Sequence, residues 1–535
     1  MLQSNIVKSE GNEGSIAGTG MEDAVMIAVK YFVTDKSITL YWDKPYDLPE
    51  DYVFEVFADG SLVGQNKKTH YTLEGLAAGR EYRIQIALSV RGMERQFLTD
   101  VLRIATGKEK RRINVTLPPY CAAGDGKTMN TAALQQAIED CDEDSVVYIP
   151  AGVFMTAALK LHSDMELYLE EGAVIQGTTR PEDYLPRIPS RFEGYEMECY
   201  SSLINMGDMD CHGDYNCKNV MIHGKGSIIS GGRLLAENII QSEKLRLREE
   251  MSRLGGKLAE YECENTIPGR VRPRLVNISN CQNVVLSGIT FAEGASWNIH
   301  MIYSDNIVTH NCVIRSKGIW NGDGWDPDSS TNCTIFATTF YTGDDSIAIK
   351  SGKNPEGNLI NRPCEHIRIF DCVSKFGLGF AMGSEMSGGI RDVQIWDCDL
   401  SNTRYGLEIK GTKKRGSFVQ DVHVRDSVVS RVMFHAVKYN DDGIGAEVPP
   451  VFADCTFENL NILGEYLAED ESVQPCSAFE LIGFDVDGYE IKNILFRDIL
   501  LQRRVHEGRQ QIDLAYCSNI TLQNIMVREA SPVTE

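Results

Sequence analysis

Several common features are missing from this sequence of 535 residues. It has no apolar run of about 18 residues or more, the length that a transmembrane helix requires. Its first residues, MLQSNIVKSEGNEGSIAGTGMED, lack the apolar stretch of a signal peptide. We therefore expect no membrane partner. We expect a cytoplasmic protein, or a secreted or periplasmic one if a leader has been removed.

Positive charge is scarce as well. The 53 Lys and Arg residues face 76 Asp and Glu residues, so the formal net charge is −23. Such an excess repels a phosphate backbone and argues against a nucleic acid partner. It does not exclude an anionic substrate, because local cations can outweigh the global charge. The length and the 42% hydrophobic content predict a large core and more than one domain.

Disulfide and metal motifs are absent although the chain has 15 cysteines. The count is odd and no C-x-x-C occurs. Free Cys behaves as a small apolar residue, so we expect buried free thiols rather than disulfides or zinc. Nothing in the sequence requires a metal or an organic cofactor. Many of these cysteines lie within a repeated phrase, among them Cys281, Cys312, Cys333, Cys372, Cys398, Cys455 and Cys517.

The repeated phrase is a polar residue, often Asn, followed by an alternation of β-branched and apolar residues. Many of the intervals between successive phrases are nearly constant, which indicates a repeat architecture. Each unit has short strands bounded by Gly, Asn or Asp and no room for a helix of about 10–15 residues. The polar positions are Asn219, Asn283, Asn306, Asn332, His366, Asp392, Asp421, Asn493 and Asn519.

This pattern predicts an all-β fold, a right-handed parallel β-helix. A leucine-rich repeat is the main competitor, but its Leu-x-x-Leu-x-Leu phrase is absent. Longer intervals, such as the one from Asn219 to Asn283, indicate loops inserted between coils. We expect those loops to form the walls of a cleft.

The first hundred or so residues have another pattern. Short alternating strands, with turn residues between them, run from about 23 to 107 and predict a small β-sandwich. Trp42 in ITLYWDKP and Tyr82 in LEGLAAGREYRIQI resemble the core Trp and the tyrosine corner of a fibronectin type III domain. We expect both side chains to pack in its core. The predicted organisation is a flexible N-terminus over 1–22, the sandwich over 23–107, a polar linker, and a catalytic β-helix over 111–535.

Two carboxylate clusters are the main candidates for chemistry. Asp323 lies in NGDGWDPDSS, and Asp344 and Asp345 lie further along the chain in TGDDSIAIKSG. One coil of the predicted helix would bring them together on adjacent strands about 4.8 Å apart. Carboxylates offset in this way span the roughly 6.5–9.5 Å that an inverting glycosidase needs for its water. Crowded acids also raise one another's pKa, so one of them can hold a proton near neutral pH. The alternative interpretation is that both clusters are ordinary turns, in which Asp and Gly are common. We interpret Asp326 and Asp328 as structural ladder or turn residues.

Residues 111–535 resemble family 28 glycoside hydrolases, the pectin-cleaving polygalacturonases. The resemblance begins at DGKTMNTAA, where it implies a capping helix over about Thr131 to Cys141. It continues through RPRLVNISNCQNVVLSGITF, the NGD and GDD clusters, and GSEMSGG. It implies that Asp344 is the general acid and that Asp323 and Asp345 position and deprotonate water.

Two family features are missing. A His-Gly pair usually follows the paired aspartates further along the chain, and alignment places Phe376 or Gly377 at the His position. A family Arg-Ile-Lys is here Glu408-Ile409-Lys410, so a cation suited to a galacturonate carboxylate is replaced by an acid. Lys350 and Lys410 would offset this loss, whereas we interpret the run Lys413, Lys414 and Arg415 as a solvated loop. The candidate substrate-binding residues are Asn321, Lys350, Glu408 and Lys410.

The sequence thus predicts a pectin-degrading glycoside hydrolase that cleaves α-galacturonosyl linkages of oligo- or polysaccharides by inversion. Bacterial exo-acting members of the family share the fibronectin module and GSEMSGG, which favours removal of units from chain ends. The insertion from about Gly232 to Arg270, with helical spacing of Leu and Met, is long enough to close one end of a cleft. A rhamnogalacturonan-type or other pectic substrate remains an alternative, as does a catalytically inactive β-helical carbohydrate-binding protein. The oligomeric state is left open.

Overall fold

The computed structural model describes residues 26–437, 444–468, 470, 472–503 and 511–529. The predicted flexible segment 1–22 lies outside these residues. The chain divides into two compact units, one formed by residues up to Arg112 with Asp142–Val146, and the other by Ile113–Cys141 with Val147 onwards. No helix among the described residues is long and apolar enough to cross a membrane.

The N-terminal unit consists of two antiparallel sheets around one core. Trp42 is 1% exposed and packs edge-on against Phe54, with ring centroids 5.3 Å apart. Tyr82 is also buried, and its hydroxyl accepts a hydrogen bond of 2.9 Å from the Ala77 amide. Both residues therefore pack in the core, as predicted. The sheets are β1 (Val29–Val33), β2 (Ile38–Trp42) and β5 (His70–Leu73), and β4 (Ser61–Asn66), β3 (Tyr52–Ala58), β6 (Glu81–Val90), β7 (Gln96–Phe97) and β8 (Leu102–Ala105).

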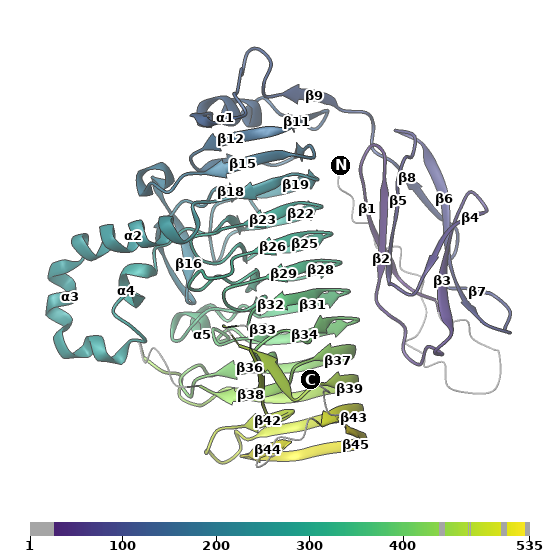
Figure 1. Cartoon of the computed structure of the whole chain (residues 1–535), viewed down its shortest axis with the longest axis vertical. Coiled ribbons are helices and arrows are strands. Elements are labelled where there is room, and N and C mark those ends of the chain that lie inside the picture. The colour runs from purple at the N-terminus through teal and green to yellow at the C-terminus, as the bar shows by residue number, and fades with distance from the viewer. Residues whose placement is uncertain (1–25, 438–443, 469, 471, 504–510, 530–535) are drawn as a thin grey trace. The chain divides into compact units, whose positions relative to one another are not determined.

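The larger unit is a right-handed parallel β-helix, which confirms the predicted fold class (Figure 1). Its strands stack from the end covered by α1 (Thr131–Glu139) to β45 (Cys517–Glu529). One long series of parallel pairs comprises β14 (Met165–Leu169), β19 (Cys217–Gly224), β22 (Cys281–Ser287), β25 (Asp305–His310), β28 (Thr334–Phe336), β31 (Cys364–Phe370), β34 (Ile390–Trp396), β37 (Phe418–Val429), β39 (Val451–Ile462), β43 (Ile491–Arg503) and β45.

Two further series complete the coils. The first contains β12 (Gly152–Thr156), β15 (Ala173–Gly177), β20 (Ser227–Ile229), β23 (Thr290–Ala292), β26 (Val313–Arg315), β29 (Thr339–Tyr341), β32 (Val373–Phe376) and β35 (Asp399–Leu400). The second is an 11-stranded sheet of β13 (Leu159–Leu161), β18 (Ile204–Met206), β21 (Val276–Ser279), β24 (Ile299–Ile302), β27 (Trp325–Asp328), β30 (Ile347–Ile349), β33 (Gly379–Met382), β36 (Gly406–Gly411), β38 (Val432–Ala436), β42 (Phe479–Ile482) and β44 (Ile512–Ala515).

The polar residue of the repeated phrase has one structural role throughout. All nine of these positions adopt a left-handed backbone, with φ between 49° and 60°. Asn and Asp tolerate this conformation better than other residues with a side chain. Several also bond from coil to coil: Asn283 Nδ2 donates to Asn219 Oδ1 at 3.0 Å, and Asn306 Nδ2 donates to Asn283 Oδ1 at 2.8 Å. The phrase therefore marks one corner of each coil.

Cysteines and aliphatic residues fill the interior, as predicted. All 15 cysteines are free, and 11 of them are buried. Cys281, Cys333 and Cys455 belong to the same continuous core cluster as the interior Ile and Val residues. Small thiols suit an interior in which each coil stacks directly on the next.

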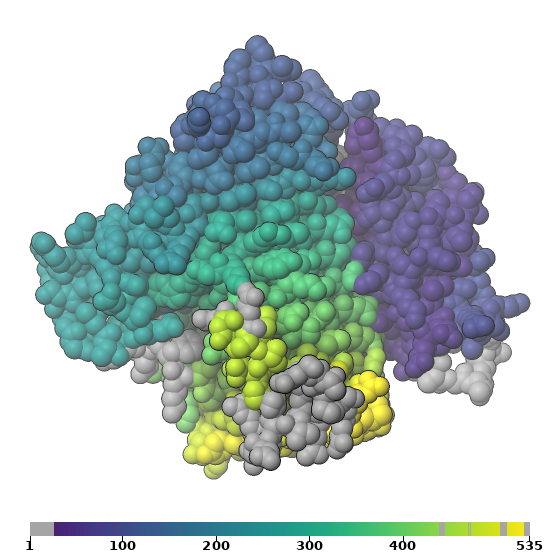
Figure 2. Space-filling view, in the orientation of Figure 1, coloured from purple at the N-terminus to yellow at the C-terminus, as the bar shows by residue number. Residues whose placement is uncertain are grey.

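The insertion between β20 and β21 is helical, as its Leu and Met spacing predicted. It contains α2 (Gly232–Arg246), α3 (Arg248–Leu254) and α4 (Thr266–Gly269). Leu235 and Ile239 of α2 are fully buried, whereas α3 has no buried residue. The helices project from the side of the β-helix unit (Figures 1 and 2).

Candidate active site

The two carboxylate clusters lie in the turns that lead into β27 and β30. Trp325 of β27 pairs in register with Ile347 of β30. Asp323 precedes Trp325 by two positions, and Asp345 precedes Ile347 by two, so these aspartates are direct neighbours on successive coils. The Gly324 amide donates to the Asp345 carbonyl at 3.0 Å. Asp344 is offset by one position. The structure thus brings the three predicted aspartates together.

The glycines of both clusters are required by close packing. A Cβ on Gly322 would lie 2.7 Å from the Ile319 carbonyl oxygen, and a Cβ on Gly343 would lie 2.4 Å from the same atom. The Gly343 amide also donates to the Gly322 carbonyl at 3.3 Å. The two turns therefore rest on each other and on the preceding turn, which fixes the aspartates that follow.

The aspartates differ in exposure. Asp323 and Asp345 are 3% and 4% exposed, whereas Asp344 is half-buried. Burial raises the pKa of Asp344 and raises that of Asp345 to about 7. The pKa of Asp323 is also raised, by burial and by the charges of Asp326 and Asp344. The cluster can therefore hold protons near neutral pH, and Asp344 is its most accessible member.

Asp326 is a fourth member of this cluster, and its interpretation as a turn or ladder residue is wrong. It lies inside β27, it is fully buried, and neither carboxylate oxygen has a hydrogen-bond partner among the described residues. Burial and the charges of Asp345 and Asp344 raise its pKa well above the usual range. Its closeness to Asp323 in the chain was the only sequence signal.

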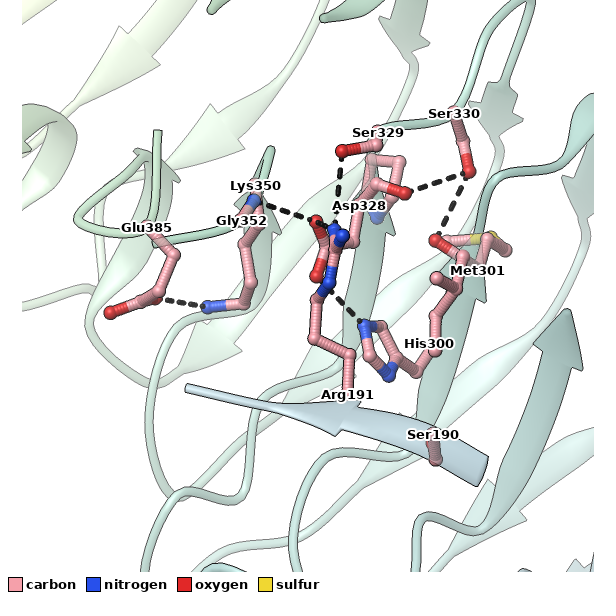
Figure 3. Close-up of polar contacts among 12 residues, drawn as sticks. Ser190, Arg191, His300, Met301, Asp328, Ser329, Ser330, Lys350, Gly352 and Glu385 are labelled. Atoms are coloured by element: carbon pink, nitrogen blue, oxygen red, sulfur yellow. Dashed lines mark hydrogen bonds and ion pairs between the residues drawn. The ribbon is translucent and has the colours of Figure 1, made fainter. Parts of the chain in front are cut away.

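Asp328 has a structural role, but as a buried ion-pair partner in β27 rather than as a turn residue. Its Oδ1 accepts from Arg191 Nη1 at 2.6 Å, and its Oδ2 lies 3.3 Å from His300 Nε2 (Figure 3). Burial opposes ionisation, but Arg191 and His300 lower the pKa of Asp328 to about 2. Arg191 belongs to a hairpin, β16 (Arg187–Phe192) and β17 (Tyr195–Tyr200), that the sequence did not reveal.

Two lysines lie among these acids. Lys350 Nζ is 3.4 Å from Asp323 Oδ2 and 3.4 Å from Glu385 Oε2. Lys410 Nζ is 3.1 Å from Asp345 Oδ2 and 3.0 Å from Glu408 Oε2. Lys350, Glu408 and Lys410 thus lie with the aspartates at one site. Each lysine already has two carboxylate partners.

Glu385 and Asn321 also connect to the site. Glu385, which sequence reasoning did not assign although it lies in GSEMSGG, has a pKa lowered to about 2, because Lys350 and Arg415 outweigh the effect of burial. Asn321 is a predicted substrate-binding residue, and its Oδ1 accepts from Arg272 Nη2 at 2.6 Å. Arg415 is 2% exposed and donates to the Ser384 carbonyl at 2.8 Å, so its assignment to a solvated loop is wrong.

Asp326, Glu408 and Lys410 of the site lie within strands of the 11-stranded sheet, and the other site residues lie in the turns next to these strands. Asp326 pairs with His300 of β24, and Glu408 of β36 pairs with Ala381 of β33 and Met433 of β38. Successive residues of a strand point to opposite faces. Because Trp325 and Leu407 point into the core, Asp326 and Glu408 point away from it.

Phe376 and Gly377, the two residues predicted for the position of the family histidine, lie at the end of β32 and directly after it. A side chain at Gly377 would begin 2.2 Å from Thr342 Oγ1, and φ there is 139°. Gly377 therefore has no space for a histidine. Phe376, at the end of β32, has a side chain whose ring centroid lies 4.0 Å from Lys317 Nζ.

Comparisons with known proteins agree with this fold. The sequence model of Glycosyl hydrolases family 28 matches residues 216–443. An exo-poly-alpha-D-galacturonosidase of Dickeya chrysanthemi is 26% identical over 485 residues, which cover 80% of this chain and 79% of the relative. An exopolygalacturonase structure from Thermotoga maritima is 26% identical, with a TM-score of 0.62, over 78% of this chain and 91% of that one. A family 28 exopolygalacturonase structure from Yersinia enterocolitica shares the fold, with a TM-score of 0.76 at 20% identity, over 96% of this chain and 100% of that one.

A parallel β-helix with clustered carboxyl groups of raised pKa, together with these relatives, defines the class: the protein is a glycoside hydrolase. Among glycoside hydrolases, it is similar to family 28, whose sequence model matches residues 216–443.

Proposed function

We propose that this protein is a pectin-degrading, exo-acting hydrolase that removes galacturonosyl units by inversion. Asp344 donates a proton to the leaving glycosidic oxygen. Asp323 and Asp345 position a water molecule and take its proton as the water attacks the anomeric carbon from the opposite face. The names of the Dickeya and Thermotoga relatives, both exo-acting on galacturonosyl chains, support the substrate and the mode.

The observation that carries the proposal is the register between β27 and β30. This register places buried Asp345 beside buried Asp323 and leaves Asp344 as the accessible acid. An acid must reach the leaving oxygen, whereas a base that activates enclosed water need not contact the substrate. The exposure of the three residues therefore supports the proposed division of roles.

Asp344→Asn tests the proposal. We expect it to reduce kcat on homogalacturonan oligomers by about 10²–10⁴-fold, the usual contribution of a general acid. Asp426→Asn, at a corner in β37 and outside the 11-stranded sheet, is the matched control. Release of reducing ends measures the rate, product size separates exo from endo action, and the anomer first formed tests inversion. Wild-type activity in Asp344→Asn would contradict the assignment, and binding without cleavage by the wild type would favour a carbohydrate-binding protein.

A rhamnogalacturonan-type substrate is the second candidate, because of the pairs formed by the lysines. Lys350 and Lys410 are each held by two carboxylates, and Glu408 stands where the family has Arg. A sugar without a carboxylate would be less affected by this loss than galacturonate. The same assay on rhamnogalacturonan oligomers compares the two substrates directly.

A further inference from the structure

His435 lies in a line of alternating charges that begins at the site. Lys410 bridges Asp345 Oδ2 at 3.1 Å and Glu408 Oε2 at 3.0 Å. The other oxygen of Glu408, Oε1, lies 3.2 Å from His435 Nδ1. Lys410 of β36 pairs in register with His435 of β38, so the contacts run between adjacent strands.

The line continues on the far side of the imidazole. His435 Nε2 lies 2.9 Å from Glu480 Oε1, and Glu480 Oε2 lies 3.6 Å from Arg431 Nη1. Both ring nitrogens of His435 thus face carboxylate oxygens, which a doubly protonated imidazole satisfies. Partial burial opposes this charge, but the bonds to Glu408 and Glu480 raise the pKa of His435 to about 9.

A buried carboxylate at position 408 needs compensation. The Glu408 side chain is 4% exposed, and an unpaired buried charge is strongly destabilising. If Lys410 alone compensated Glu408, less of its charge would be available to Asp345. Because His435 contacts the opposite oxygen of Glu408, it shares that task with Lys410.

On the basis of the proposed roles of the aspartates, we propose that His435 is a positioning residue of the active site. Its imidazolium neutralises Glu408, so that Lys410 can hold Asp345 in the ionised form that activates water. Without that positive charge, the field at Asp345 becomes more negative and protonation of Asp345 becomes easier.

Other titratable groups lie near β36, β38 and β42, and a substitution of His435 leaves them unchanged. Asp513 of β44 pairs in register with Glu480 and accepts from Ser477 Oγ at 2.6 Å. Tyr405 precedes β36 and has its pKa raised by burial, which keeps it neutral. His435 contacts Glu408 of β36 and Glu480 of β42, Lys410 is its register partner, and Arg431 before β38 contacts Glu480. The groups that act on Asp345 are Asp323, Asp326, Asp344, Lys350, Lys410 and Glu408.

The test compares a neutral and a cationic replacement. In the pH profile of kcat/KM, the acidic limb is the fall in activity as the pH decreases. We expect His435→Gln to shift the midpoint of this limb to a pH higher by roughly half to one unit, since one nearby charge shifts a carboxyl pKa by about that much or more. His435→Lys should retain the wild-type limb, because it restores the charge. His423→Gln is the matched control, since His423 also contacts a carboxylate, Asp421 Oδ1 at 2.8 Å, on a different strand. Thermal unfolding of each variant checks that it is folded.

A double-mutant cycle separates charge from packing. Glu408→Gln should shift the midpoint of the same limb to lower pH, because Lys410 then pairs with Asp345 alone. His435→Gln should add no further shift in the Glu408→Gln background. An unchanged limb in His435→Gln, or equal shifts in the Gln and Lys variants, would overturn the proposal. If Asp345→Asn keeps wild-type kcat/KM, the proposed function fails instead.

A second measurement does not depend on activity. The chain has 10 histidines, and ¹³C-labelled histidine with His435→Gln for assignment gives the His435 signal by NMR. We expect this imidazole to remain protonated through neutral pH and to titrate near 9. Titration near its ordinary value of about 6.5 would overturn the proposal, whatever the substrate is.

Discussion

Neighbouring residues of one turn have different environments at this site. Asp344 and Asp345 are adjacent in sequence, and the Asp345 amide donates to Asp344 Oδ1 at 3.0 Å. Only Asp345 has a lysine at 3.1 Å, while Asp344 retains partial exposure. Two carboxyl groups with different surroundings can take different roles, one as acid and one as base. The turn thus provides both groups side by side.

The buried pair of Asp328 and Arg191 gives a prediction at the residue scale. Asp328→Asn would leave the Arg191 guanidinium, 1% exposed, without its 2.6 Å partner. Breaking a buried pair from one side costs about 3–5 kcal/mol. We therefore expect a clear loss of thermal stability at pH 7. Asp392→Asn, whose partners His366 and Arg368 lie nearer the surface, should cost about 1 kcal/mol or less.

The difference should depend on pH. The pKa of folded Asp328 is about 2, below its ordinary value of 3.8, so the folded state favours the ionised form. Its contribution is fully present above the ordinary value and is lost as pH falls towards 2. Unfolding midpoints of wild type and Asp328→Asn should therefore converge between about pH 4 and pH 2. A difference that persists unchanged at the lower pH would contradict an electrostatic origin.

At the scale of one element, the corner that starts each strand combines two local effects. Asn283 has φ of 60°. Its side-chain amide donates to Asn219 on the coil before and accepts from Asn306 on the coil after. The left-handed backbone is unfavourable for Ala by about 1–2 kcal/mol but not for Gly. Each hydrogen bond contributes about 0.5–1.5 kcal/mol. Side-chain bonding and backbone conformation can therefore be separated by two substitutions.

We expect Asn283→Ala to destabilise the β-helix by about 2–4 kcal/mol, and Asn283→Gly by about 1–2 kcal/mol less. Asn283→Gly can keep the left-handed backbone conformation and loses only the side-chain hydrogen bonds to Asn219 and Asn306. The urea midpoint of the β-helix transition, followed by far-UV circular dichroism, measures both changes. Equal midpoints for the two variants would show that backbone strain at this corner is negligible.

These corners also explain what could be predicted from the sequence. Nearly constant intervals between the polar residues predicted the coil because the left-handed position recurs once per coil, and the observed register follows the same steps, such as Val284 with Ile307. The sequence did not predict which aspartate of the second cluster lies directly beside Asp323 on the next coil. The spacing of the two clusters pointed to Asp344 and Asp345 together, but the pairing of Trp325 with Ile347 makes Asp345 the direct neighbour. The lengths of individual turns decide such a shift, and they leave no periodic signal.

Contacts between distant segments were not predictable. Arg191 reaches Asp328 across 137 residues, from a hairpin that interrupts the repeat. The same holds for His435 and Glu480, 45 residues apart in sequence and brought together by the stacking of β38 on β42. Single residues of this kind have no local pattern. Only the assembled sheet brings them together.

At the scale of the whole molecule, the interior of the β-helix unit is one continuous core that includes many thiols. Of the 15 cysteines, Cys121 and Cys263 are exposed, Cys211 and Cys517 are intermediate, and the remaining 11 are buried. Burial raises the pKa of Cys312 to about 12, and the thiolate is the reactive form. Burial therefore limits access to the interior thiols while the coils remain stacked, and at Cys312 it also disfavours the reactive form.

A thiol count tests the integrity of this column. We expect the native protein to react rapidly with DTNB at two positions and more slowly at two others, and the protein denatured without reductant to show all 15 thiols. Cys121→Ser with Cys263→Ser should abolish the rapid phase, which identifies its source. Fewer than 15 thiols after denaturation would reveal disulfides and contradict the free-thiol interior. Rapid reaction of many more in the native state would mean that coils open locally, because a thiol in the core reacts only when its neighbouring coil separates.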